Sequence, residues 1–191
     1  VALKLGDPTA RDAGRLTFNP IKHVDIWGLL MMAIFRFGWA KPVPIDMRNF
    51  KHPVRDMAIT AAAGPISNVI LAFLALCIRA GAIYVNQKTG GVISGFIITF
   101  TEYTAILSVG LAVFNVIPIP PLDGSKVLNS LLPQNVYYKI LRYERYGFLV
   151  MMLVLYTGIL DTPLDFCRNA LLSGLGTISA FPYYILRGIF G

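Results

Sequence analysis

Met57–Cys77 has the sequence MAITAAAGPISNVILAFLALC, 21 residues without a charged side chain. At about 1.5 Å per residue, a helix of this length matches the roughly 30 Å hydrocarbon core of a bilayer. Arg55 and Asp56 precede the stretch and Arg79 follows it, so charged groups flank it on both sides. The stretch predicts a transmembrane helix, and the chain is predicted to be an integral membrane protein.

The composition of the whole chain supports this prediction. Apolar residues make up 55% of the 191 residues and charged residues 14%, against about 25% charged in a soluble domain. This argues against a soluble enzyme, a disordered tail or a nucleic-acid-binding module. The net charge of +7 comes from basic residues between long apolar runs, as in loops that face anionic lipid. Cys77 and Cys167 lie in apolar surroundings, so we expect neither a disulfide framework nor a Cys-rich metal site.

Two further segments are candidates for crossing the membrane. Residues 92–117 are interrupted only by Glu102, and the prolines that begin at Pro118 must end this helix. Residues 146–160 are uncharged but short for a span, so tilt or local thinning would have to compensate. We therefore predict an all-α membrane protein, a multi-pass transmembrane helical bundle, with residues 1–191 forming one membrane-embedded core.

Other apolar segments are not predicted to cross the membrane. Residues 26–37 are too short and are expected to form a re-entrant or short apolar segment. Residues 38–46 contain Pro42 and Pro44, which exclude a helix and favour an irregular, β-like re-entrant segment. Irregular backbone at membrane depth requires protein or a water-filled cavity to satisfy it, so a polar cavity is expected nearby. Residues 163–191 are expected to be interfacial or partly inserted.

The basic residues predict the orientation. Eight lie on the side that precedes Met57 and follows Ile117, against three on the opposite side, which places the first side in the cytoplasm. The first group is Lys41, Arg48, Lys51, Arg55, Lys126, Lys139, Arg142 and Arg145, and the second is Arg79, Lys88 and Arg168.

Asp123 is the first candidate functional residue. It follows the proline-rich run 116–122 and precedes Gly124, so a rigid turn places a carboxylate at the end of a membrane helix. An ionisable group near membrane depth is costly and is a functional hypothesis by default. The alternative is a helix N-cap, because Asp-Gly-Ser is also a plausible start for the next helix. The residues alone leave both interpretations open.

Three other residues are candidates for the same site. Asn115 lies where the helix ends and could present its amide to a shared cavity, although the residues alone favour a local bond to the backbone. Gly64 and Asn68 are four residues apart and share one helix face, so a second helix could approach closely and receive a hydrogen bond. Such a small-residue motif more often indicates packing than catalysis.

The segment Asn115–Gly124, NVIPIPPLDG, resembles the second signature of the site-2 protease family of intramembrane zinc metalloproteases, in the compact prokaryotic form without a PDZ domain. Other segments resemble the same subfamily, occur in the family's order and cover most of residues 1–160. They are Lys4–Ala10, Gly14–Pro20, Gly38–Pro44 and Ala63–Asn68.

The resemblance implies a role for each candidate residue. Asp123 would be the third protein ligand of a catalytic zinc ion, and Asn115 would help bind or polarise the substrate carbonyl. Gly64 and Asn68 would belong to a packing motif beside the site. The irregular segment would form part of the substrate-access region, with Trp39, Pro42 and Pro44 as its candidate residues.

The chain departs from the family pattern in one respect. The first family signature, His-Glu-x-x-His, supplies two zinc ligands and the general base, and it does not occur in this sequence. In relatives it lies just before the segment that resembles Val1–Leu5. We therefore expect the remaining zinc ligands upstream of Val1, and we expect residues 1–191 alone to be inactive.

The function expected from the resemblance is a zinc endopeptidase that cleaves transmembrane segments of proteins or peptides, as in regulated intramembrane proteolysis. It would lie in a prokaryotic cell membrane, in contact with the bilayer and without a nucleic-acid partner. The alternative is a catalytically inactive scaffold or binding protein that retains the fold. A small transporter is a third possibility, but the sequence lacks the repeated halves of common transporter designs.

Overall fold

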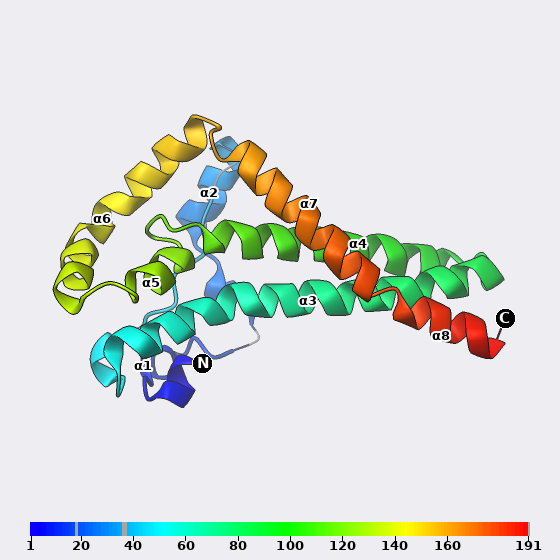
Figure 1. Cartoon of the computed structure of the whole chain (residues 1–191), viewed down its shortest axis with the longest axis horizontal. Helices are drawn as coiled ribbons and strands as arrows, with labels where there is room; N and C mark the ends of the chain where they lie inside the picture. The colour runs from blue at the N-terminus through cyan, green and yellow to red at the C-terminus, as the bar shows by residue number, and fades with distance from the viewer. Residues whose placement is uncertain (18, 36–37, 191) are drawn as a thin grey trace. The chain divides into compact units, whose positions relative to one another are not determined.

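The computed structural model describes residues 1–17, 19–35 and 38–190, and every regular element in these ranges is helical (Figure 1). The all-α prediction is therefore confirmed for them. The elements are η1 Ala2–Leu5, α1 Thr9–Asp12, η2 Pro20–His23, α2 Ile26–Phe35, η3 Met47–Asn49, α3 Pro53–Thr89, α4 Val92–Val116, α5 Asp123–Asn129, α6 Gln134–Tyr156, α7 Asp161–Ile178 and α8 Phe181–Phe190. Parts of three predicted segments lie outside the described residues: residue 18 of 14–20, residues 36–37 of 26–37 and residue 191 of 163–191.

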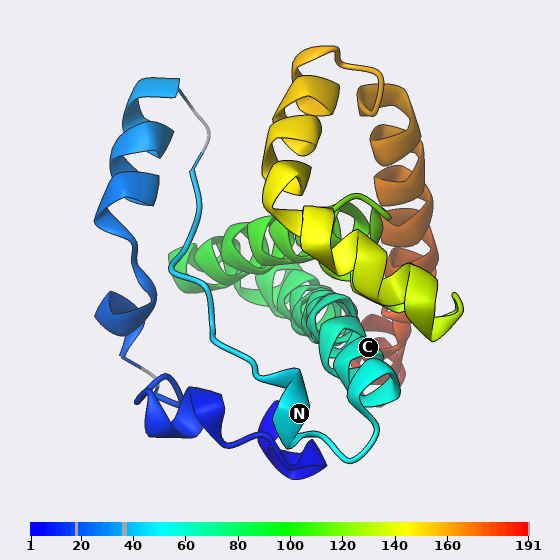
Figure 2. The same ribbon diagram turned by 90° about the vertical axis from the view of Figure 1, so that its left-hand side faces the viewer.

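The chain divides into two compact units, residues 1–60 and 61–191. In the first unit, residues 38–46 are irregular, as predicted, and run back beside α2, where Gly28 lies against the backbone of Trp39 (Figure 2). The β-like character expected there is absent from the described residues. Pro42 and Pro44 have no N–H group to donate to a strand ladder. Arg15 holds the segment instead, because its guanidinium donates to the carbonyl of Lys41 at 2.6 Å.

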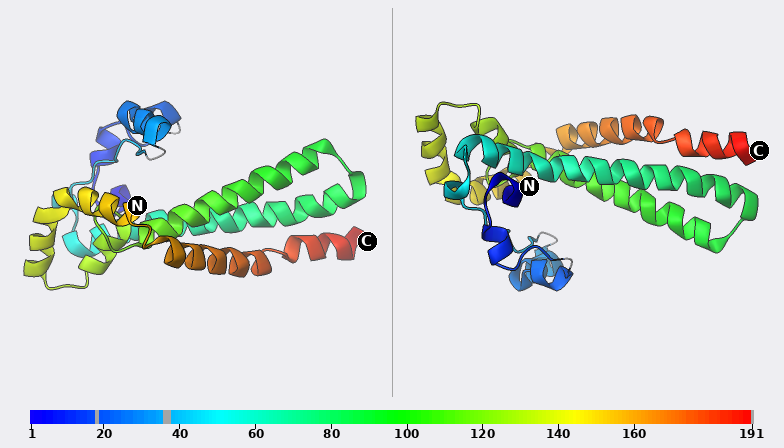
Figure 3. Two further views of the ribbon diagram at one scale, coloured as in Figure 1. Left: turned by 90° about the horizontal axis from the view of Figure 1, so that it is seen from above. Right: turned by 90° about the horizontal axis from the view of Figure 1, so that it is seen from below.

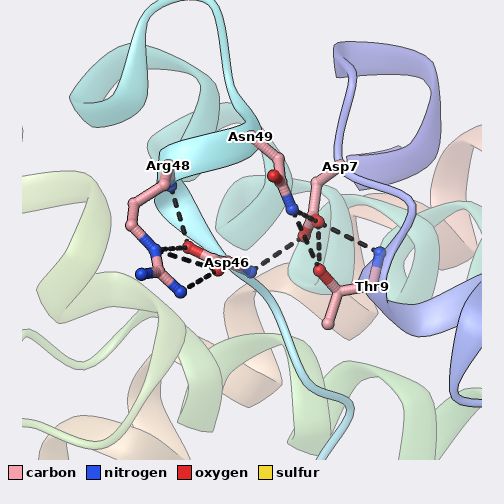
Figure 4. A network of polar contacts seen from close by, with 5 residues as sticks. All are labelled: Asp7, Thr9, Asp46, Arg48 and Asn49. Carbon is pink, nitrogen blue, oxygen red and sulfur yellow. Dashed lines mark hydrogen bonds and ion pairs between the residues drawn. The ribbon is translucent and has the colours of Figure 1, made fainter.

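A buried carboxylate links the two ends of the first unit. Asp7 accepts hydrogen bonds from the backbone and hydroxyl of Thr9, from the Asp46 N–H at 3.0 Å and from Asn49 Nδ2 at 2.8 Å (Figure 4). Arg48 pairs with Asp46 at 2.6 Å beside this network. Burial by itself would raise the pKa of Asp7, but the hydrogen bonds outweigh it and lower the pKa to about 2.

We expect Asp7→Asn to destabilise the protein by about 2 kcal/mol near neutral pH. The single side-chain oxygen of asparagine can accept only some of the hydrogen bonds that the two Asp7 oxygens accept. The asparagine NH₂ group would instead face N–H and O–H donors, which it cannot bond. The pKa is lowered in the folded state, so the stabilisation by Asp7 is present above the ordinary value of 3.8 and is lost as the pH falls toward about 2. Denaturant unfolding at several pH values should therefore show the two proteins converging in acid.

Asp12→Asn is the matched control, because Asp12 is exposed and, among the described residues, forms its ion pair with its exposed neighbour Arg11. It should change the free energy of unfolding by less than about 0.5 kcal/mol. A stability difference between wild type and Asp7→Asn that did not change between pH 6 and pH 2.5 would contradict the role given to the Asp7 carboxylate.

Two long helices dominate the second unit. α3 and α4 lie side by side and are joined by Gly90 and Gly91 (Figures 1 and 3). Small buried residues of both helices form the core, and leucines of α7 pack against it; the core residues are Ala72, Ala75, Ala105 and Val109. Small side chains allow close approach of the backbones, which is how helices associate in a membrane, where lipid is as apolar as the protein.

α3 and α4 are long and apolar enough to cross a membrane. α3 contains the predicted segment 57–77, and α4 covers the predicted segment 92–117 except its last residue. The third predicted segment, 146–160, is divided, because α6 ends at Tyr156 and the chain bends by 88° before the helices from Asp161 onward. The multi-pass topology and the interfacial position of 163–191 remain predictions.

Candidate functional site

A closed turn joins α4 to α5. Pro118 ends α4, and Gly124 lies against the carbonyl groups of the two residues before this proline. A Cβ at Gly124 would overlap the Val116 carbonyl and lie 2.8 Å from the Ile117 oxygen. The Leu122 N–H donates to the Ile119 carbonyl at 3.0 Å within the turn. The tight return of the chain holds the first turn of α5 against the end of α4.

Asp123 is the first residue of α5, and its carboxylate lies against α3. A Cβ at Gly64 of α3 would come within 2.9 Å of Asp123 Oδ2. Leu122 takes the N-cap position, and no side-chain bond caps the helix. The half-buried carboxylate accepts no hydrogen bond from the described residues. The N-cap alternative is therefore not observed, and no described side chain donates to either carboxylate oxygen.

The surroundings of Asp123 favour binding of a cation. Burial raises the pKa of the carboxyl group, and the positive charge of Lys126 opposes this with a smaller effect. A carboxylate that has lost water without gaining donors is stabilised by a metal ion, and Asp is a common zinc ligand. Asp123 therefore fits the role of one zinc ligand. Within the described ranges no three His, Cys, Asp or Glu side chains lie close enough to form a complete site.

Asn115 lies in the last turn of α4, and Nδ2 of its amide donates to the Leu111 carbonyl at 2.9 Å. This is the local bond that the sequence alone favoured. Asn115 immediately precedes Val116, whose carbonyl faces Gly124, so the turn returns the chain close to the end of α4 that carries this amide.

The remaining predicted residues differ in their relation to Asp123. Gly64 lies against its carboxylate, and Asn68 is one turn further along α3, half-buried and without a side-chain hydrogen bond to a described residue. The candidate substrate-access residues Trp39, Pro42 and Pro44 belong to the first unit, whereas Asp123 belongs to the second.

Sequence reasoning missed an apolar groove beside the Gly64–Asp123 contact. It has a volume of about 400 Å³, and its lining contains no charged residue. The lining residues are Ala62, Pro65, Ile66, Val116, Pro118, Gly124, Val127, Leu128 and Leu131. Pro65 and Gly124 are the chain neighbours of Gly64 and Asp123, so the groove is continuous with the candidate site. The available sequence signal was the apolar spacing of Val127, Leu128 and Leu131, although α5 ends at Asn129 and Leu131 lies in the turn that follows it.

Comparisons with known proteins find a peptidase family and relatives named as zinc metalloproteases. Residues 80–157 match the profile of Peptidase family M50. YwhC of Bacillus subtilis (strain 168), named as a candidate zinc metalloprotease, is 37% identical over 162 residues, which cover 83% of this chain and 73% of YwhC. No solved structure gives a significant match.

Other relatives carry the same kind of name. Rip2 of Mycolicibacterium smegmatis is 27% identical over 164 residues, and SA1105 of Staphylococcus aureus (strain N315) is 32% identical over 88 residues. The chain spans 61% of the length of Rip2 and 20% of SA1105. The matched region is therefore a part of these longer proteins.

Proposed function

Because the chain belongs to Peptidase family M50, the site-2 protease family, we propose that it forms the core of a membrane-embedded zinc endopeptidase. The proposed reaction is hydrolysis of peptide bonds in or near transmembrane segments of membrane proteins. The names of the relatives support a zinc-dependent peptidase, and the two long apolar helices support a membrane location.

The contact between Asp123 and Gly64 is the observation that supports this proposal most directly. It brings together two segments that the family resemblance assigns to one site, the proline-rich turn and the small-residue face of α3. The carboxylate there is half-buried and accepts no hydrogen bond from the part of the chain that the structure describes, as expected for a metal ligand. The other ligands and the general base would come from a His-Glu-x-x-His segment, the first signature that the family resemblance implies.

Each residue of the site would have a distinct task. Asp123 would hold the zinc ion from the α5 side, and Gly64 leaves room for its carboxylate. Zinc, when bound, polarises the substrate carbonyl and acidifies a water molecule. Asn115 would turn its amide from Leu111 to the substrate carbonyl. This exchange costs little because, in a helix, the Leu111 carbonyl also accepts the backbone N–H four residues later.

The apolar groove supports a transmembrane substrate. A peptide bond held at Asp123 would place a neighbouring substrate side chain beside Pro65 and Gly124, where the groove opens. No lining residue carries a charge, so a charged substrate side chain would lose water without gaining a partner. An apolar side chain would gain about 1.5–3 kcal/mol on full burial.

We expect metal removal to abolish cleavage by the complete protein. Purified protein treated with a zinc chelator should lose cleavage of a membrane-embedded reporter peptide, and stoichiometric zinc should restore it. The measurement is reporter cleavage together with bound zinc per chain. Magnesium, which prefers oxygen ligands in octahedral geometry, is the control and should not restore activity.

The alternative function is an inactive scaffold that retains the fold. It would be favoured if the complete protein contained no His-Glu-x-x-His segment, bound no zinc and left the reporter intact. Cleavage that persisted at full rate after zinc removal would overturn the zinc peptidase proposal.

A further inference from the structure

Arg79 of α3 has hydrogen-bonding capacity that no described residue uses. One guanidinium nitrogen, Nη2, lies 3.5 Å from Glu102 of α4, and the two side chains are 33% and 48% exposed. The Nε atom is buried and has no partner among the described residues. The terminal guanidinium N–H groups of this one-third exposed side chain are therefore the donors that a ligand could meet, whereas the buried Nε is out of its reach.

Arg79 lines a cavity of about 270 Å³ between α3 and the α7–α8 region. In both views of Figure 3, α7 and α8 run alongside α3. The polar lining includes Gln87, Ser179 and Tyr183, and the Tyr183 hydroxyl donates to Gln87 Oε1 at 3.0 Å. Pockets for drug-sized ligands usually exceed about 300 Å³, so the cavity suits a small polar group.

The cavity lies at the expected level of lipid headgroups. Arg79 follows the uncharged stretch 57–77 by two residues, and a hydrocarbon core of roughly 30 Å that ends with this stretch leaves Arg79, its neighbour Glu102 and residues 92–101 of α4 beyond the core. Tyr183 and Tyr184 line the same cavity, and tyrosines are enriched at the membrane interface. The planar guanidinium fork matches the oxygens of a phosphate.

We propose that this cavity binds the phosphate group of an anionic phospholipid through Arg79. The hydroxyl groups of Tyr183 and Ser179 already donate to Gln87 Oε1 and to the Gly176 carbonyl, so Arg79 supplies the donors to the phosphate, and the acyl chains remain in the surrounding bilayer. The site rests on the proposed crossing of the membrane by α3 and is independent of peptide hydrolysis. Glu102 competes with the phosphate for the guanidinium, because its carboxylate already approaches Nη2.

The test is a titration of the complete protein, in neutral detergent, with short-chain phosphatidylglycerol. Arg79→Gln should weaken binding about tenfold, the equivalent of one charge-assisted hydrogen bond. Glu102→Gln should tighten it, because the competing carboxylate is removed. Lys88→Gln is the matched control, since Lys88 lies on the same helix, over the Tyr84 ring and outside the cavity lining. It should leave binding unchanged.

Two outcomes would overturn the proposal. Equal weakening by Arg79→Gln and Lys88→Gln would indicate attraction to positive charge in general. Inorganic phosphate that bound as tightly as the lipid would assign the site to free phosphate. Should Arg79→Gln fail to fold, Glu102→Gln still decides, because tighter binding supports the site and unchanged binding rejects it. None of these measurements requires peptide cleavage, so their failure is separate from failure of the peptidase proposal.

Discussion

Asp123→Ala is expected to abolish reporter cleavage by the complete protein and to lower its bound zinc. The half-buried carboxylate lies against Gly64 and accepts no hydrogen bond from a described residue, so a metal ligand is the role that its surroundings favour. Removal of an outer-shell partner in metalloenzymes costs roughly 10–100-fold in metal affinity or activity. Removal of a direct zinc ligand should reduce metal affinity and activity by more than this.

The same substitution should barely change stability. An acidic residue in the first turn of a helix contributes about 0.3–1 kcal/mol, while removal of a poorly solvated carboxylate offsets part of that loss. For a chain of this size 1 kcal/mol corresponds to roughly 2–4 °C in Tm. We therefore expect Tm to shift by no more than a few degrees while activity disappears.

Asp165→Ala is the matched control, because Asp165 is exposed and pairs with Arg168 in the same helix at 3.0 Å. Both cleavage and bound zinc should remain at wild-type levels. Full activity in Asp123→Ala would reject the metal-ligand assignment, and a large fall in Tm with retained zinc would indicate a structural role instead.

Gly124→Ala is expected to destabilise the turn that carries Asp123. The added methyl group would overlap the Val116 carbonyl and approach the Ile117 oxygen, and these backbone atoms cannot move aside as a flexible side chain could. Overpacking of this kind costs about 1–3 kcal/mol, and more where the backbone cannot relax. If α5 moved away to relieve this steric overlap, the Asp123 carboxylate would be displaced. Reporter cleavage should therefore fall together with Tm.

Gly110→Ala provides the control for the exchange of glycine for alanine. Gly110 lies within α4, and a Cβ there would meet no atom within 4 Å. Alanine in the middle of a helix is more stable than glycine by about 0.5–1 kcal/mol, so Tm should rise slightly and activity should persist. A wild-type Tm in Gly124→Ala would contradict the close packing of the turn.

Hydropathy predicted the position of α3 but not its ends. The uncharged stretch 57–77 reports the part suited to hydrocarbon, whereas the helix extends from Pro53 to Thr89. Charged residues such as Arg79 and Lys88 do not end a helix, because their long side chains reach water or a partner while the backbone bonds continue. The prolines after Val116, in contrast, placed the end of α4 within one residue, because proline lacks the N–H group that a helix requires.

The candidate site was predictable in the same uneven way. Asp123 was identifiable because a proline-rich turn places a carboxylate next to a membrane helix, which is chemically costly. The hydrogen bond of Asn115 was also predictable, since it joins residues one turn apart. The apolar groove was not, because its lining comes from three separate segments.

The sequence by itself determined that the chain is apolar and helical, where the turn after α4 lies, and which family it resembles. These properties depend on composition and on local chemistry within a few residues. Only the tertiary structure decided that the Asp123 carboxylate lies against Gly64 and that Arg79 faces a cavity formed with α7 and α8. Such contacts depend on how distant helices pack, and the steric fit between their side chains is not encoded in the pattern of any single segment.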